Sequence, residues 1–246
     1  MTKKYTGSSG HSKKVRGAKH FIDEVDEARK VTNEVHRILT TRYNGAGSVF
    51  HDDTSTTQNQ NLQTIVNYHN KQTRDLDWSI HFNAASITDA PRGVEVLYYD
   101  AKDLATKVSA AIAKVSSLKD RGAKQRTELY FLRNTNKPAI LLEICFVDSK
   151  VDVELYRKNF NAICTAIAEV LANYLGYTPK EAEQAREDEQ DLAQELLNGT
   201  GRNSCKEMIK RGIEEKLFTS QHENVNRYTD KELISYALAY VNRKTK

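Results

Sequence analysis

The first 177 residues alternate between short apolar runs and longer segments with helical periodicity. Five segments are expected to be β-strands, one of them unusually polar, at residues 3–9, 77–85, 92–100, 128–134 and 138–148. Four segments repeat apolar residues at helical spacing, at 21–40, 61–72, 101–118 and 159–176. Strands that alternate with helices are typical of an α/β domain.

The run "PAILLEICFVD" at 138–148 is apolar at nearly every position. A strand that is apolar on both faces belongs in the middle of a sheet that helices cover on both sides. We therefore expect a twisted mixed or parallel sheet with helices on both faces. The helical pattern at 159–176 ends in Gly176, which suits a helix C-terminus.

The pattern changes after residue 177. Pro179 opens a charged, alanine-rich stretch that we interpret as a helical linker at 178–190, and "NGTGRN" at 198–203 interrupts it. Two further helices are expected at 204–218 and 229–244. Residues 191–246 are therefore expected to form a small all-helical domain that follows an α/β domain at 1–177. Two helices bury too little surface to be stable alone, so they must pack on a neighbour, on the preceding helix or on a second copy.

Composition and charge argue against several classes of partner and of structure. The chain has 246 residues, of which 39% are apolar, and a net charge of +4 that is spread along the sequence. It lacks a basic face with interleaved aromatic residues, so we expect no nucleic-acid partner. It also lacks an apolar run of about 18 residues and a signal-peptide pattern at its start, so we expect neither a membrane span nor export by the usual route. Three widely spaced cysteines argue against a disulfide framework or a cysteine zinc site.

Three polar residues are candidates for metal binding or catalysis. His11 lies in a glycine-rich turn, His81 lies near the end of an apolar strand, and Glu143 interrupts the run at 138–148. Ligands collect at the ends of strands in α/β sheets, and two imidazoles with a carboxylate resemble a catalytic zinc set. The alternatives are an ordinary loop histidine, a hydrogen-bonded strand-end histidine and a paired buried glutamate. Cys145 shares the face of Glu143, where a buried apolar role is favoured over a nucleophile.

The motifs "SGHSKKVRGA", "DWSIHFNA", "GVEVLYY" and "RGAKQRTELYFLRNTNKPAILLEICFVDS" occur in this order, with an acidic helix start after the first. Together they resemble the zinc-dependent N-acetylmuramoyl-L-alanine amidases of the amidase-3 type. The similarity is strongest to the catalytic domains of bacteriophage endolysins and covers about residues 3–177.

The resemblance implies one zinc ion held by His11, Glu24 and His81, with Glu143 as the catalytic residue. Among the acids of the helix start, Glu24 is preferred because the apolar pattern after it matches the family's helix, while Asp23 and Glu27 remain alternatives. Glu143 is expected to take a proton from water and deliver it to the leaving amine. Its apolar strand should raise its pKa and the nearby metal should lower it.

Two further residues are candidates for substrate binding. Asn83 is expected either near the metal or as a cap at the strand end. Arg121 lies in "RGAK", which resembles a loop that lines the family's substrate groove, and its cation suits a peptide carboxylate. A surface arginine is the alternative.

The resemblance implies hydrolysis of the amide between N-acetylmuramic acid and L-alanine in peptidoglycan, leading to host lysis. The protein is expected to be made in the host cytoplasm and to reach the wall after holin-dependent release. The C-terminal helices are expected to bind a cell-wall polymer, or alternatively to form a homo-oligomer. The competing hypotheses are a zinc peptidase that cuts within the stem peptide and a non-catalytic wall-binding protein.

Overall fold

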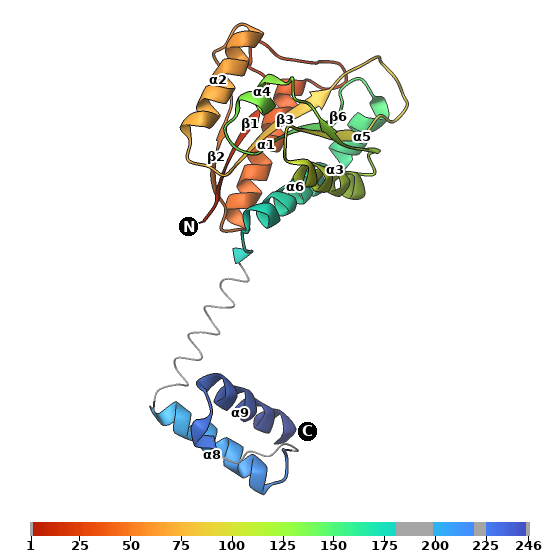
Figure 1. Cartoon of the computed structure of the whole chain (residues 1–246). Coiled ribbons are helices and arrows are strands. Elements are labelled where there is room, and N and C mark those ends of the chain that lie inside the picture. Colours follow the sequence, from red (N-terminus) through yellow and green to blue (C-terminus); the bar gives the residue numbers. More distant parts are fainter. Residues whose placement is uncertain (1, 181–198, 219–224, 245–246) are drawn as a thin grey trace. The chain divides into compact units, whose positions relative to one another are not determined.

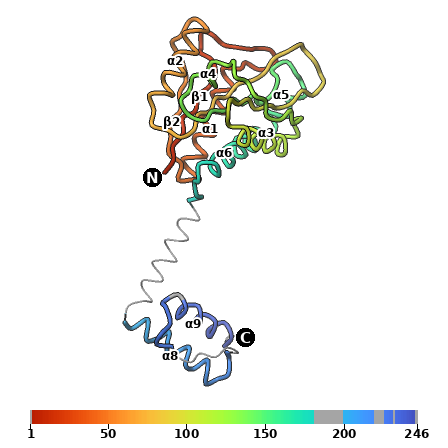
Figure 2. The backbone as a smooth tube through the Cα atoms, in the orientation of Figure 1, coloured from red at the N-terminus to blue at the C-terminus, as the bar shows by residue number. Residues whose placement is uncertain are grey.

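The computed structural model describes residues 2–180, 199–218 and 225–244. The chain divides into two compact units, residues 1–180 and 181–246, and each is described by itself. Figure 1 shows the first unit as a sheet surrounded by helices, and Figure 2 traces the same path as a tube. The predicted linker at 178–190 lies outside the described residues, except for its first three. Those three pair with the end of the first helix, where Tyr43 bridges to Pro179 and Thr178 donates its backbone N–H to Asn44.

The first unit contains one six-stranded mixed sheet with the order β2-β1-β3-β6-β4-β5. The strands are β1 (Lys4–Ser9), β2 (Ala46–Phe50), β3 (Leu76–Asn83), β4 (Val94–Tyr98), β5 (Asp120–Gln125) and β6 (Ala139–Phe146). Strands β2, β1, β3 and β6 run parallel, whereas β4 pairs antiparallel with β6 and parallel with β5. The carboxyl ends of β1, β3 and β6 therefore meet at one edge of the sheet.

Helices cover both faces of this sheet, which confirms the predicted fold class. The helices of this unit are α1 (Glu24–Thr41), α2 (Gln58–Lys71), α3 (Lys102–Ser116), α4 (Tyr130–Asn134), α5 (Lys150–Lys158) and α6 (Phe160–Leu175). The larger core lies between the sheet and α1, α3, α5 and α6, and a smaller core lies under α2 and α4. Helix α6 ends at Gly176, whose φ of 74° suits a residue without a Cβ.

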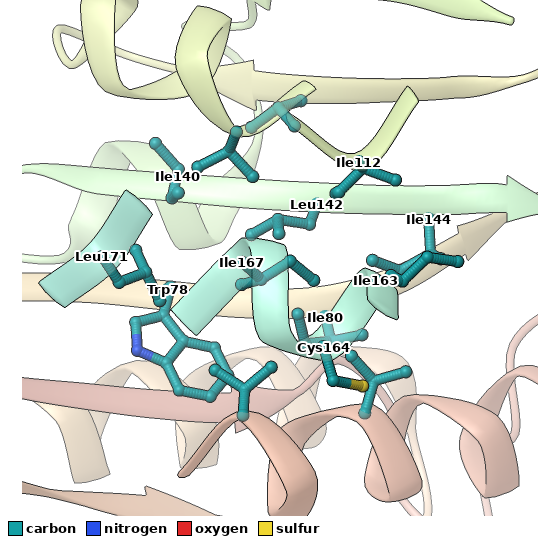
Figure 3. Close-up of a cluster of buried hydrophobic side chains, with 14 of the residues drawn as sticks. Trp78, Ile80, Ile112, Ile140, Leu142, Ile144, Ile163, Cys164, Ile167 and Leu171 are labelled. Atoms are coloured by element: carbon teal, nitrogen blue, oxygen red, sulfur yellow. The ribbon is translucent and has the colours of Figure 1, made fainter. Parts of the chain in front are cut away.

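The centre of the larger core explains why β6 reads as continuously apolar. Ile140, Leu142 and Ile144 point from β6 toward α6, while Trp78 and Ile80 do so from β3 (Figure 3). Ala139 and Leu141, which alternate with them on β6, belong to the smaller core under α2 and α4. Both faces of β6 are thus covered, as its composition predicts.

Three sequence predictions about elements were wrong or incomplete. Residues 128–134, expected as a strand, contain the short helix α4, because a brief apolar run does not distinguish a strand from a buried helical turn. The "RGAK" segment, expected as a loop, is part of β5. Strand β2 was not predicted, since its sequence "AGSVF" is short, half-exposed and has little apolar pattern.

The second unit is a helical hairpin in its described part. It consists of α8 (Gly199–Glu214), a 3₁₀ turn (Val225–Arg227) and α9 (Asp230–Lys244). The two helices pack through Cys205, Ile209, Val225, Leu233 and Ala237. Thr229 and Glu232 bond reciprocally at the start of α9 and form a capping box. The predicted break at 198–203 was wrong in its described part, because α8 already begins at Gly199.

Within the described segments, every helix is too short or too polar to cross a lipid bilayer.

Candidate metal centre and cleft

Three side chains from separate elements converge at the carboxyl edge of the sheet. His11 follows β1 in a turn, Glu24 is the first residue of α1, and His81 lies near the end of β3. One ligand atom from each lies within 4.8 Å of the others. The parallel pairing of β1 with β3 brings the two histidines together, and their ring centroids are 5.0 Å apart.

The carboxylate of Glu24 lies between the two imidazoles. Its Oε1 is 3.1 Å from Nε2 of His11 and 3.1 Å from Nδ1 of His81. A tetrahedral ion with bonds of about 2.0–2.1 Å places neighbouring ligand atoms roughly 3.3 Å apart. The two nitrogens and one oxygen therefore fit a divalent metal such as zinc in donor type, and both distances from Glu24 are close to that spacing.

Two glycines make room for this arrangement. A Cβ at Gly10 would lie 1.9 Å from Cε1 of His81. A Cβ at Gly17 would lie 2.3 Å from Oε2 of Glu24, and Gly17 has a φ of 70° that other residues adopt at a cost. The turn between β1 and α1 thus approaches the three side chains more closely than any other residue type allows.

Glu24 is held in place by backbone groups. Ala18 donates its N–H to Oε2 at 2.8 Å, and Phe82 donates to Oε1 at 3.1 Å. Burial disfavours the charged carboxylate, but contacts with His11 and His81 outweigh it and lower the pKa of Glu24 well below its ordinary value. The anionic form that a metal requires is therefore favoured.

The structure distinguishes Glu24 from the two neighbouring acids. Asp23 forms an ion pair with Arg16, and Glu27 pairs with Lys30 and accepts a hydrogen bond from Tyr156. Glu24 is the acid of this segment that belongs to the three-residue cluster.

Glu143 lies beside the cluster on β6, opposite His81 in the parallel pairing with β3. It is partly buried, and its Oε2 is shielded from solvent without a hydrogen-bond partner among the described residues. Burial and the nearby charges of Glu24 and Glu95 raise the pKa of Glu143 from 4.5 to about 8. In the absence of a cation, this carboxyl therefore holds its proton at neutral pH.

A cleft of about 370 Å³ runs from this cluster along the sheet face under α2 and α4. Its lining residues are Gly10, His11, Gln58, Asn61, Leu62, His81, Asn83, Glu95, Leu97, Arg126, Leu129, Tyr130, Phe131, Leu141 and Glu143. One end thus holds the histidines and Glu143, and the walls beyond it are largely apolar or aromatic.

Of the two residues predicted to bind substrate, Asn83 lines the cleft and Arg121 does not belong to its lining. Arg121 donates from Nε to Glu95 at 2.6 Å and stacks over the ring of Phe146, with its guanidinium carbon 5.0 Å from the ring centre. Asn83 donates to the other oxygen of Glu95 at 3.1 Å. Both residues are therefore tied to Glu95.

The sequence analysis missed Glu95, the acid that organises this part of the cleft. It lies opposite Glu143 in the antiparallel pairing of β4 with β6 and is 6% exposed. Lys124 joins Arg121 in neutralising it. A carboxylate between two apolar residues in "GVEVLYY" was the signal that could have revealed it.

Cys145 is fully buried, and burial raises the pKa of its thiol. These properties fit the favoured reading of Cys145 as a small core residue.

Comparisons with known proteins place these features in a family context. A sequence profile described as N-acetylmuramoyl-L-alanine amidase matches residues 8–173. An endolysin of Bacillus phage SPP1 is 30% identical over 203 residues, which cover 77% of this chain and 72% of that protein. The catalytic domain of CD27L, an endolysin targeting Clostridia difficile, superposes with a TM-score of 0.63 at 26% identity, covering 70% of this chain and 97% of that chain.

Two relatives from Clostridium perfringens are longer than this chain. An uncharacterized 38.4 kDa protein is 30% identical over 228 residues, which cover 90% of this chain and 64% of that protein. A second uncharacterized protein is 34% identical over 170 residues, which cover 66% of this chain and 49% of that protein. The chain therefore spans roughly half to two-thirds of the length of these relatives.

Proposed function

We propose that this chain, which belongs to the N-acetylmuramoyl-L-alanine amidase family, hydrolyses the amide that joins the lactyl group of N-acetylmuramic acid to L-alanine in bacterial peptidoglycan. The observation that supports this reaction most directly is the cluster of His11, Glu24 and His81 beside Glu143 at one end of a cleft. Side chains that can hold a metal, a carboxyl that can act as a base and room for a peptide are thereby available in one place.

One zinc ion is the cofactor that we propose for His11, Glu24 and His81. When bound, the zinc ion would polarise the scissile carbonyl and lower the pKa of a water molecule that it binds. The two imidazoles bind it in their neutral form, and burial favours that form at His81 by lowering its pKa.

Glu143 moves the proton in this proposal. Its Oε2, which has no partner in the described chain, takes a proton from the attacking water and gives it to the amine of L-alanine as the amide breaks. Without a cation the pKa of Glu143 is about 8, and a divalent cation at the neighbouring cluster would lower it, so that the carboxylate form can accept the proton. Asn83 and Glu95 border the same space, and their hydrogen bond links β3 to β4 across β6.

The biological role that we propose is lysis of a bacterial host from within. Similarity to an endolysin of a Bacillus phage supports this role. The protein would be made in the host cytoplasm and reach the wall after holin-dependent release. We propose that the unit containing α8 and α9 binds a cell-wall polymer, with self-association as its alternative role.

Digestion of purified cell walls tests the proposed reaction. Wild-type protein should release peptides with a new N-terminal L-alanine and leave muramic acid intact. A chelator should abolish this release, and added zinc should restore it. Glu143→Gln should lower the rate by about 10²–10⁴-fold while the protein still binds metal, because proton transfer contributes roughly that much.

Other products would point to other functions. New termini within the stem peptide would indicate a zinc peptidase. Wall binding without any cleavage, unchanged by Glu143→Gln, would indicate a non-catalytic wall-binding protein.

A further inference from the structure

We infer that Arg126 recognises a carboxylate on the peptide side of the scissile amide, so that the enzyme prefers a stem peptide whose second residue carries a free α-carboxylate over one in which it is amidated. This inference rests on the proposed function and specifies its substrate. It concerns the end of the cleft that lies away from the three-residue cluster.

The cleft follows the direction of β4 and β6 across the face of the sheet. Glu95 pairs with Glu143 at the end beside the cluster, and two residues further along β4, Leu97 pairs with Leu141. All four line the cleft, as alternate residues of two paired strands on one face should. Arg126 stands beyond them, where its backbone N–H bonds to the carbonyl of Tyr98 at 2.9 Å.

Of the three cations on β5 and the residue after it, two are already neutralised. Arg121 and Lys124 both pair with the buried carboxylate of Glu95. Arg126 lines the cleft, and its ion pair with Glu128 spans 3.8 Å between side chains that are 44% and 69% exposed. An exposed pair at that distance contributes little. The guanidinium also donates from Nη1 to the carbonyl of Gln125 at 3.3 Å, and its remaining N–H groups are available to a ligand.

The position of Arg126 matches the length of a short peptide. Tyr98 is the third residue after Glu95, which corresponds to about 10 Å along a strand. Two peptide residues extend about 7 Å from the scissile carbonyl, and the long arginine side chain spans the difference. Leu97 and Leu141, between the two ends, offer apolar contact to a side chain as small as the methyl group of alanine.

The charge of Arg126 identifies which half of the substrate lies there. N-acetylmuramic acid carries no ionised group once its lactyl carboxyl is in the amide, whereas the stem peptide carries carboxylates. The residue after L-alanine is D-glutamate linked through its γ-carboxyl, and its α-carboxylate is either free or amidated. Arginine binds a carboxylate by charge-assisted, two-pronged hydrogen bonds that a neutral amide does not match.

A pair of soluble substrates tests this inference. They are N-acetylmuramoyl-L-alanyl-γ-D-glutamyl-L-lysine and the same compound with the glutamyl α-carboxylate converted to its amide. Wild-type enzyme should show a kcat/KM about tenfold or more higher for the carboxylate form, expressed mainly in KM. Arg126→Gln should reduce that preference to less than about threefold, and Arg126→Lys should retain part of it.

Arg133→Gln is the matched control. Arg133 is on α4, a short distance along the chain, and it lies outside the residues that line the cleft. This variant removes the same charge and should keep the wild-type preference.

Equal cleavage of both substrates by the wild type would overturn the inference and leave the amidase reaction intact. A preference that survives Arg126→Gln, or that Arg133→Gln abolishes equally, would also overturn it. Failure of the wild type to cut either substrate between muramic acid and alanine would contradict the proposed function as well.

Discussion

Gly17 allows the turn after β1 to come close to Glu24 and His11, because it has no Cβ. Alanine at this position should weaken metal binding at least tenfold, because its Cβ would displace the carboxylate of Glu24. Gly122 is a matched control, since its φ of 75° is close to the 70° of Gly17, and a Cβ there would meet nothing within 4 Å among the described residues.

Both Gly17→Ala and Gly122→Ala should lose about 1 kcal/mol of stability from backbone strain. Zinc titration monitored by calorimetry separates strain from crowding. Equal zinc affinity in the two variants would show that the space at Gly17 does not matter to the cluster.

Glu143 should make the stability of the metal-free protein depend on pH. Its folded-state pKa of about 8 exceeds its ordinary 4.5, so the folded state favours the protonated carboxyl. The stability that the folded state gains from the protonated carboxyl of Glu143 is fully present below pH 4.5 and is lost as pH rises through about 8. Glu143→Gln avoids the loss, so its stability relative to wild type should improve between pH 5 and pH 8.5.

The size of that change should be on the order of a few kcal/mol. Each pH unit between the two pKa values corresponds to about 1.4 kcal/mol, and contact of the carboxyl with the cleft reduces the total. Urea unfolding of chelator-treated proteins at the two pH values measures it. A constant difference between the variants would mean that Glu143 is not forced toward its protonated form.

At the residue scale, sequence reasoning reached the residues whose type is unusual for their position. His11 lies in a glycine-rich turn, and His81 and Glu143 lie in apolar strands. Glu24 was identified through the family resemblance. Substrate binding by Arg121 stays a prediction, and its pairing with Glu95 was not predicted, because β4 and β5 are recognised as neighbours only in the folded sheet. For the same reason the position of Arg126 in the cleft was not predicted.

At the scale of elements, a buried ion network joins α2 to the strand that carries His81. Asp77 of β3 accepts hydrogen bonds from Arg74 and contacts His69 of α2 at 2.8 Å, and all three side chains are nearly or fully buried. Asp77→Asn would leave Arg74 buried without its counterion. We expect a loss of about 3–5 kcal/mol in the free energy of unfolding, measured by urea denaturation.

The pair of Glu34 with Arg37 provides the comparison. It is a salt bridge along α1, with Arg37 half-exposed, and Glu34→Gln should cost less than about 1 kcal/mol. If the two substitutions proved equally mild, the network around Asp77 would not be what holds α2 against β3.

Element types were predictable where the apolar pattern was long. The helices at 21–40 and 159–176 and the strand at 138–148 are confirmed with shifts of a few residues at their ends. Helix α4 was not, because its five residues bury Phe131 and Leu132 through contacts with α2 and β6 that local periodicity does not encode. Edge strands β2 and β5 carry too few apolar residues to be distinguished from loops.

At the scale of the whole molecule, the cluster and its cleft lie within residues 1–180. A chain shortened to these residues should therefore fold and cleave a soluble muramoyl peptide within about twofold of the full-length rate. If the second unit binds wall polymer, the same truncation should lower the rate on intact walls at least tenfold. Equal activity of both forms on intact walls would contradict the proposed role of α8 and α9.

The change in composition after residue 177 and the central apolar strand predicted the two-part organisation and the layered sheet. The order of the strands was not predictable in the same way, because the antiparallel insertion of β4 beside β6 depends on pairing between distant segments.

The central claim is that His11, Glu24 and His81 bind one divalent metal beside Glu143. Anomalous X-ray diffraction at the zinc edge, from crystals grown with zinc, tests it most directly. We expect one strong anomalous peak per chain, within about 2.0–2.2 Å of Nε2 of His11, an Oε of Glu24 and Nδ1 of His81. Diffraction that shows these side chains ordered with no peak between them, or with the metal bound elsewhere, would contradict it.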